Sequence, residues 1–455
     1  MPTTQAMPWR RASGLLAAVA LALAACTGET SPTPGASAAA SAAVTDGGPV
    51  DIGQVVMLSS QLVPVEEAEK MRSQILADFA GEVEFIGAES GPFNDRVRAE
   101  GETGSGDVSV IGGLHGEFAS FAADGLLMDL SDVADELADL GINEQYLELG
   151  KLGTDQQLYI PWMQATYVMA ARSEAMEYLP DGADIDALTW EQVTEWGANI
   201  EEATGERKLG FPAGEDGLWH RFFQGYGYPA FTGALNTAFA SDDAVAMWDW
   251  LADTWQYVNP QSTTYGFMQE PLQSGEVWVA WDHTARLIEA LRSQPDDMVA
   301  FPAPAGPSGR AFMPVVAGLA IPNSAENPDG AKELIKYLLQ PQTQATTLSA
   351  VSFFPVITAE LPGDLEPGQQ AEEAAVTTMT NASDALPSLL PIGLGDQGGA
   401  YNQVFRDAFQ QIILDGQDAA TVLDSLAGNL QEVLDTVEAA CWPPDPESDG
   451  TCQVQ

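Results

Sequence analysis

Basic residues are scarce in this chain of 455 residues, which carries 17 lysines and arginines against 66 aspartates and glutamates, for a net charge of −49. A nucleic-acid duplex or an anionic membrane surface would repel such a chain, so we exclude both as electrostatic binding partners. Two explanations of the acidity stay open. One is an adaptation to high salt, where screening weakens self-repulsion; the other is the ordinary composition of an exported protein from a GC-rich bacterium.

The sequence also lacks the residue patterns of common catalytic and metal sites. Its 3 histidines, His115, His220 and His283, lie far apart in the chain. It contains no H-E-x-x-H, C-x-x-C or G-x-S-x-G motif and no phosphate-binding glycine loop. We therefore expect no catalytic residue, no metal and no cofactor. Pairs of carboxylates are frequent only because acidic residues are frequent, which leaves glycoside hydrolysis as a weak alternative.

Cysteine is equally rare, with 3 residues in the chain, and the first follows an export signal. Arg10 and Arg11 precede an apolar stretch, 14–25, that is too short to span a bilayer but is typical of a signal peptide. Cys26, preceded by Leu-Ala-Ala, resembles the lipidated cysteine of bacterial lipoproteins; an ordinary secretory signal with an incidental cysteine is the alternative. We expect a signal peptide at 1–25, lipid on Cys26, and a flexible tether at 26–49.

The other two cysteines, Cys441 and Cys452, enclose a Trp-Pro-Pro-Asp segment that cannot be helical. Because the export signal places them in an oxidising compartment, we expect a disulfide between them that closes the C-terminal tail, 441–455. A metal site is the weaker alternative, because no histidine lies nearby.

The body of the chain alternates short apolar segments with amphipathic ones. Strands are predicted at 54–58, 83–86, 107–111, 277–281, 298–301 and 318–322. Asn327 and Pro328 are typical of the N-cap and first position of the next helix. The alternation predicts an α/β fold with mostly parallel sheets, in which ligands bind at the carboxyl ends of strands. A chain of this length is expected to form two domains.

The order of these segments resembles the extracellular solute-binding proteins of ABC importers, of the carbohydrate-binding type (family 1). The similarity covers residues 50–440 and rests on the spacing of five segments: 275–281, Pro-Ala-Pro at 302–304, Ala-Gly-Leu-Ala-Ile at 317–321, Asn-Pro-Asp-Gly-Ala at 327–331, and 352–355. Residues 158–162 resemble the family's strand that crosses between lobes, although the usual glycine is replaced here and Ala171-Arg172 replaces a Tyr-Asn pair.

This resemblance implies a two-lobe periplasmic-binding-protein-like (type II) α/β fold, with hinge strands and an interlobe ligand cleft. Lobe one would comprise 50–160 and 299–341, and lobe two 161–298 and 342–440. Candidate ligand-binding residues are polar groups at predicted strand ends and aromatic rings near predicted loops, whose faces stack on sugar rings. They are Ser60, Gln61, Glu89, His115, Trp162, Trp219, Trp281, Asp282, Gly318, Phe354 and Tyr401. Trp281 is alternatively a core residue.

The implied function is that of a lipid-anchored substrate-binding component of an ABC importer, not an enzyme. It would be a monomer on the extracytoplasmic face of the cell membrane, where it captures a sugar or oligosaccharide by hinge closure and delivers it to permease subunits. A receptor for a non-sugar solute, such as a polyamine, peptide or metal chelate, is the alternative. A polyamine would suit the acidity, whereas the aromatic residues near predicted loops suit a carbohydrate. A secreted glycoside hydrolase is the weakest alternative.

Overall fold

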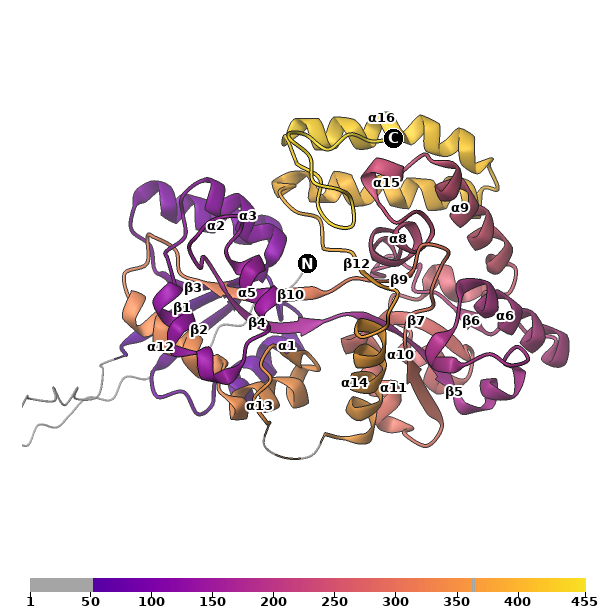
Figure 1. The fold of residues 1–455 in the computed structure, drawn as a ribbon. Coiled ribbons are helices and arrows are strands. Elements are labelled where there is room, and N and C mark those ends of the chain that lie inside the picture. Colours follow the sequence, from indigo (N-terminus) through magenta and orange to yellow (C-terminus); the bar gives the residue numbers. More distant parts are fainter. Residues whose placement is uncertain (1–51, 362, 364) are drawn as a thin grey trace, which may run out of the picture. The chain divides into compact units, whose positions relative to one another are not determined.

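The computed structural model describes residues 52–455, apart from 362 and 364. The predicted signal peptide, Cys26 and the tether lie outside these residues. Within the described part, no helix is both long and apolar enough to cross a membrane. Two main sheets organise this part of the chain, each flanked by helices (Figure 1).

The first sheet has six strands in the order β11-β4-β10-β3-β1-β2. Their bounds are β1 Gln54–Ser59, β2 Glu82–Gly87, β3 Val108–Leu114, β4 Ile160–Ala165, β10 Val315–Ala320 and β11 Phe354–Pro355. β1 runs parallel to β2 and β3, but β10 is antiparallel to β3 and β4, and β11 is antiparallel to β4. The prediction of mostly parallel sheets is wrong here, because β10 and β11 do not follow the strand-helix-strand connection of β1–β3.

The second sheet has the strand order β6-β7-β5-β8 and is also mixed. Its strands are β5 Tyr167–Arg172, β6 Leu209–Gly210, β7 Val279–His283 and β8 Met298–Phe301. Two further short strands, β9 Arg310–Phe312 and β12 Ala385–Pro387, pair in parallel beside it. β5 and β7 are buried along almost their whole length, which explains their continuous apolar sequences.

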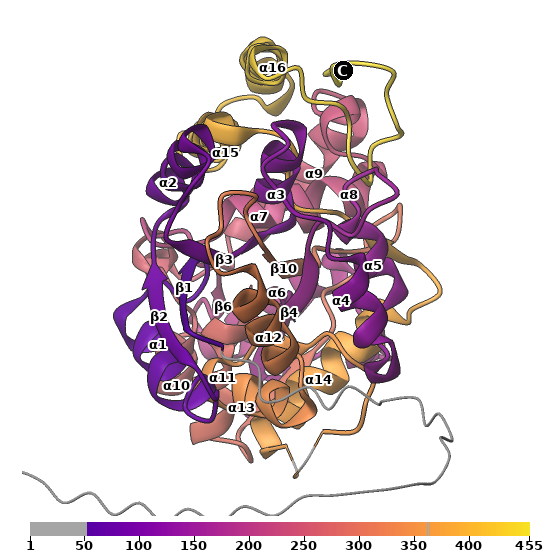
Figure 2. The same ribbon diagram turned by 90° about the vertical axis from the view of Figure 1, so that its left-hand side faces the viewer.

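Helices from distant parts of the chain cover each sheet (Figures 1 and 2). The first sheet is accompanied by α1 Val65–Lys70, α2 Ser90–Thr103, α3 His115–Ala123, α4 Ser131–Glu136, α5 Glu144–Gly150, α12 Pro328–Leu338 and α13 Pro341–Val351. The second is accompanied by α6 Trp190–Thr204, α7 His220–Phe222, α8 Tyr228–Thr232, α9 Asp242–Trp255, α10 Gln269–Ser274, α11 Thr284–Ser293, α14 Pro367–Thr380, α15 Gly398–Phe409 and α16 Ala419–Thr436.

Helix α12 shows how local sequence sets an element boundary. The side-chain oxygen of Asn327 accepts the N–H of Gly330 at 3.0 Å, which confirms the predicted N-cap, and Pro328 occupies the first turn. The Asn327 amide also donates to the carbonyls of Ile52 and Gln54. One side chain thus starts the helix and fastens it to the beginning of β1.

The chain passes between the two sheets three times, at Thr166, at 313–315 and after β11. These positions differ from the lobe boundaries expected at 160, 298 and 341. β4 stays in the first sheet to Ala165, β8 pairs with β5 of the second, and β11 returns to β4 of the first. Thr166 Oγ1 donates to the carbonyl of Met313 at 2.9 Å, so two crossings are bonded to each other.

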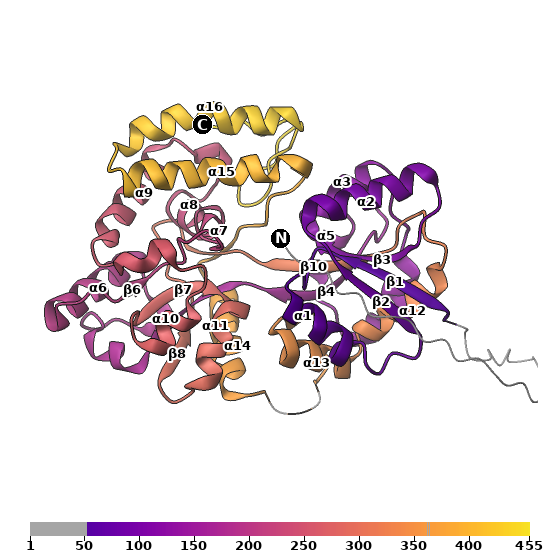
Figure 3. The same ribbon diagram turned by 180° about the vertical axis from the view of Figure 1, so that it is seen from behind.

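The C-terminal tail folds back over the helices that flank the second sheet, where its end lies near α16 (Figure 3). A disulfide joins Cys441 and Cys452. Inside this loop, the buried carboxylate of Asp445 accepts hydrogen bonds from the backbone N–H groups of Leu235, Asn236 and Thr237 at 2.8–3.0 Å, and from the side chains of the last two. The N–H of Ala240 donates to the carbonyl of Gln455. These bonds fasten the tail to the segment before α9.

Candidate functional site

A polar cluster lies at the carboxyl ends of β1 and β3. Ser60 Oγ donates to Glu117 Oε2 at 2.6 Å, and Gln61 Nε2 donates to Ser60 Oγ at 3.1 Å. Glu117 also accepts the N–H of Leu114 at 2.8 Å, which caps the start of α3. Burial raises the pKa of Glu117, and the bond from Ser60 opposes this. Ser60 and Gln61 thus follow the end of β1, and Ser60 is bonded to the start of α3 through Glu117.

Glu117 is a member of this polar cluster that the sequence reasoning missed. Its signal was its position, as the third residue of a helix that begins directly after a buried strand. Glu89, which was predicted, lies exposed at the start of α2, and the structure gives its side chain no capping bond.

His115 and Gly318 are explained by packing around Tyr159. His115 is buried, with Nδ1 2.9 Å from the Tyr159 hydroxyl, and burial lowers its pKa to about 4, so the ring is neutral near pH 7. A Cβ at Gly318 would lie 2.2 Å from the Tyr159 ring. Glycine at this position of β10 therefore provides room for an aromatic ring, and needs no ligand to account for it.

Trp162 and Phe354 lie on β4 and β11 and are also buried. The Trp162 carbonyl accepts a bond from the Gln344 amide at 2.9 Å. Neither ring lies on an exposed surface of the structure.

Trp281 and Asp282 of β7 lie inside the second sheet's core, not at its surface. The Trp281 indole stacks on the Tyr167 ring with centroids 4.7 Å apart and is 2% exposed. Asp282 is fully buried, and its two oxygens accept the N–H groups of Met268 and His283 at 2.9 and 2.8 Å. Burial raises its pKa to about 6. Both residues are covered by chain segments distant in sequence, among them the ring of Tyr167 and the backbone of Met268.

The cavity beneath Trp281 is small. It measures about 40 Å³ and is lined mainly by apolar side chains, among them Phe211, Phe222 and Trp250. Ligand pockets typically enclose roughly 300–1,000 Å³. This cavity is therefore a packing defect of the aromatic core and has no room for a sugar.

Trp219 and Tyr401 lie near the ends of α7 and α15. Trp219 is 7% exposed, its ring packs against Phe409, and the guanidinium of Arg406 lies 5.3 Å from its ring centroid. Tyr401 is fully buried and its hydroxyl donates to Asn236 Oδ1 at 2.7 Å. Trp219 thus lies beside a partly exposed charged group, Arg406.

The structure places a second polar cluster around Trp219 that the sequence reasoning missed. Arg406 Nη2 lies 3.2 Å from His220 Nδ1, and Arg221 Nη1 donates to Gln224 Oε1 at 2.7 Å. The Gln224 amide donates in turn to Asn402 Oδ1 at 2.9 Å. Burial, then the charge of Arg221, lowers the pKa of His220 well below its usual value. The available signal was the rarity of basic residues, which makes each arginine informative.

Neither cluster is suited to a metal. Within the residues that the structure describes, no group of three or more histidine, cysteine, aspartate or glutamate side chains is arranged to hold a metal ion.

The chain was compared with known proteins. A family model described as "Bacterial extracellular solute-binding protein" matches residues 66–345. No curated protein matches. Similar solved structures include maltose-bound MalE3 of T. maritima, at 19% identity and a TM-score of 0.66, covering 84% of this chain and 100% of that one.

Two other similar structures cover 84% of this chain as well. The GacH receptor of Streptomyces glaucescens, solved unliganded and with acarbose, has 17% identity, a TM-score of 0.64 and 98% coverage of its own chain. UgpB from Mycobacterium tuberculosis, solved with glycerophosphocholine, has 18% identity, a TM-score of 0.66 and 99% coverage. At these identities the likeness establishes the periplasmic-binding-protein-like fold.

Proposed function

Because the chain belongs to the bacterial extracellular solute-binding proteins, we propose that it is the lipid-anchored receptor of an ABC importer for a carbohydrate-like solute. Members of this family bind a solute and do not transform it. The observation that carries the proposal is the family match over residues 66–345, which includes strands of both main sheets. The receptor would act as a monomer outside the cytoplasm, held to the membrane by lipid on Cys26.

The three crossings support a division into two lobes. We assign 52–165 and 315–359 to lobe one, and 167–313 and 367–455 to lobe two, according to the sheet that each segment joins. Solute would bind between the lobes, where the Ser60, Gln61 and Glu117 cluster supplies hydrogen-bonding groups for hydroxyls. The bond between Thr166 and Met313 makes these two crossings a common pivot for closure.

A thermal-shift screen of the purified protein against oligosaccharides, followed by titration calorimetry, tests the receptor function. A solute at 100 times its Kd stabilises the folded state by about 2.7 kcal/mol, so a true ligand raises the melting temperature clearly. Gln61→Ala should weaken solute binding. Gln156→Ala, at an exposed position between α5 and β4, is the control and should leave binding unchanged. Hydrolysis of a chromogenic glycoside by the protein would contradict the proposal.

Membrane fractionation tests the anchor. Cys26→Ser should release the protein from the membrane fraction, because it removes the site of lipid attachment. Cys452→Ser is the matched control: it removes a different cysteine and should leave the protein in the membrane fraction. Equal retention of the wild type and Cys26→Ser would disprove lipidation at this position.

A further inference from the structure

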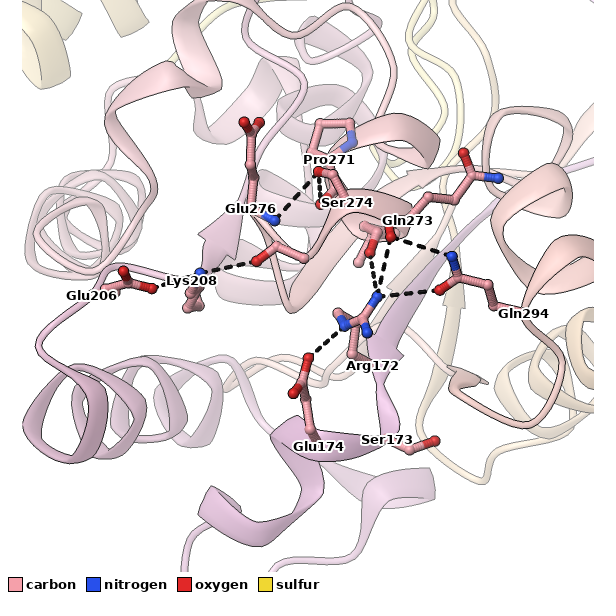
Figure 4. A network of polar contacts seen from close by, with 12 residues as sticks. Arg172, Ser173, Glu174, Glu206, Lys208, Pro271, Gln273, Ser274, Glu276 and Gln294 are labelled. Atoms are coloured by element: carbon pink, nitrogen blue, oxygen red, sulfur yellow. Dashed lines mark hydrogen bonds and ion pairs between the residues drawn. The ribbon is translucent and has the colours of Figure 1, made fainter.

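Ion pairing of basic side chains is almost complete in the described part of this acidic chain. Every lysine and arginine described there pairs with a carboxylate except Arg72, Arg221, Arg286 and Arg406. Figure 4 shows the usual arrangement, with Glu174 beside Arg172 and Glu206 beside Lys208. Arg72 donates to the carbonyl of Phe85. The other three arginines belong to one neighbourhood.

Arg221, Arg286 and Arg406 come from α7, α11 and α15 and meet around the segment 214–224. Arg406 reaches His220, and Arg221 is the next residue along the chain. Arg286 Nη1 donates to the carbonyls of Asp216 and Gly266 at 2.9 and 3.0 Å. All three residues are partly exposed. Burial, opposed by two tyrosines and reinforced by Arg406, lowers the pKa of Arg221.

The nearby acidic groups do not neutralise this cluster. The charge of Arg286 acts to lower the pKa of Asp282 and that of Glu67, against the larger effect of burial, but Arg286 forms no ion pair with either carboxyl. Asp282 instead uses both oxygens on backbone N–H groups. Arg286 also lies 4.2 Å from the ring centroid of Phe267, a side chain that is 45% exposed. An exposed ring and an unpaired guanidinium thus lie together at this position.

Three like charges without a carboxylate are costly when partly removed from water, so they need an opposite charge from elsewhere. The net charge of −49 repels anions from the chain as a whole, whereas a cluster of arginines attracts them locally. Guanidinium groups bind carboxylate and phosphate with paired, charge-assisted hydrogen bonds.

We propose that Arg221, Arg286 and Arg406 bind an anionic group, a carboxylate or a phosphate, on a hydroxylated solute. The inference rests on the proposed receptor function. It narrows the solute class from carbohydrate-like solutes in general to acidic carbohydrates and polyol phosphates. UgpB from Mycobacterium tuberculosis, solved with the phosphodiester glycerophosphocholine, indicates that this fold accommodates an anion-bearing solute.

Titration calorimetry of the full mature chain with three probes tests the inference: trigalacturonate, glycerol 3-phosphate and the neutral maltotriose. We expect at least one anionic probe to bind about thirtyfold or more tightly than maltotriose, and its identity distinguishes a carboxylate from a phosphate ligand. Arg406→Gln and Arg286→Gln should each weaken that binding about tenfold to a hundredfold, the value of a charged hydrogen bond. Arg207→Gln, at an exposed ion pair, should leave it unchanged.

The outcomes separate this inference from the receptor function. Binding of maltotriose alone overturns the anion site and leaves the receptor function intact. Failure of both anionic probes to bind overturns the anion site in every case. Arginine variants that bind within threefold of the wild type also overturn it, provided that their melting temperatures match that of Arg207→Gln. Arg286 is the more peripheral position, so Arg286→Gln serves where Arg406→Gln does not fold.

Discussion

Removal of the Asp445 carboxylate should loosen the C-terminal tail and destabilise the helices beneath it. Asp445→Ala leaves the N–H groups of Leu235 and Asn236 without a partner, and both residues are fully buried. A buried donor without an acceptor costs about 1–3 kcal/mol, so the two together cost about 2–6 kcal/mol. The N–H of Thr237 also loses its bond, but Thr237 is partly exposed and water replaces Asp445 there.

Urea unfolding followed by circular dichroism measures this loss. The matched control is Asp449→Ala, which removes the same charge from an exposed position in the same disulfide loop. The control should change the unfolding free energy by less than about 0.5 kcal/mol, as surface substitutions do. Asp445→Asn should be less harmful than Asp445→Ala but still destabilising, because its amide oxygen keeps one set of acceptor bonds while its NH2 group faces N–H donors. Equal unfolding midpoints for Asp445→Ala and Asp449→Ala would refute the reasoning.

Three further predictions concern buried positions. Glu372 is 1% exposed, its carboxyl oxygens lack hydrogen-bond partners, and burial raises its pKa above 4.5. The stability of the wild type relative to Glu372→Gln is therefore highest below pH 4.5. It falls by about 1.4 kcal/mol per pH unit as the pH rises towards the folded-state pKa of Glu372. Urea unfolding from pH 4 to 8 measures this difference, and a pH-independent one contradicts the assignment. Trp281→Ala should lower the unfolding free energy of the apo protein by about 3–5 kcal/mol, because it removes a core side chain. An unchanged melting temperature would contradict this and would favour a ligand-contacting role for Trp281. Gly318→Ala should cost about 1–3 kcal/mol through collision with Tyr159, and a Tyr159→Leu background should restore most of it.

The sequence predicted the elements well because their signals are local. The apolar run at 298–301 forms β8 with the same bounds, and Asn327 caps α12 as its neighbours indicate. The family resemblance also led to the correct fold class. The local patterns did not reveal that Trp281 and Asp282 are buried. Trp281 ends an apolar run before a polar residue, which is equally typical of a strand tip and of a buried strand.

The missing information was the position of segments distant in sequence. The Trp281 indole is buried by Tyr167, Phe222 and Tyr226, which no pattern around residue 281 reveals. The arginine cluster likewise joins three helices, α7, α11 and α15, that lie far apart in the sequence. Local patterns also do not reveal which sheet a strand joins, because that depends on its partner strand: β8 pairs with β5 and β11 pairs with β4.

The position of β10 in the first sheet has a consequence for synthesis and export. Ile111 of β3 pairs with Ala320, so the edge of β3 has no strand partner until residue 320 has left the ribosome or the export channel. Strands that wait for a distant partner fold slowly, and their apolar edges associate with other chains meanwhile. The first sheet is therefore assembled late, around a strand that arrives after most of the second sheet has been delivered, and the nascent chain depends on being kept apart from its neighbours until then.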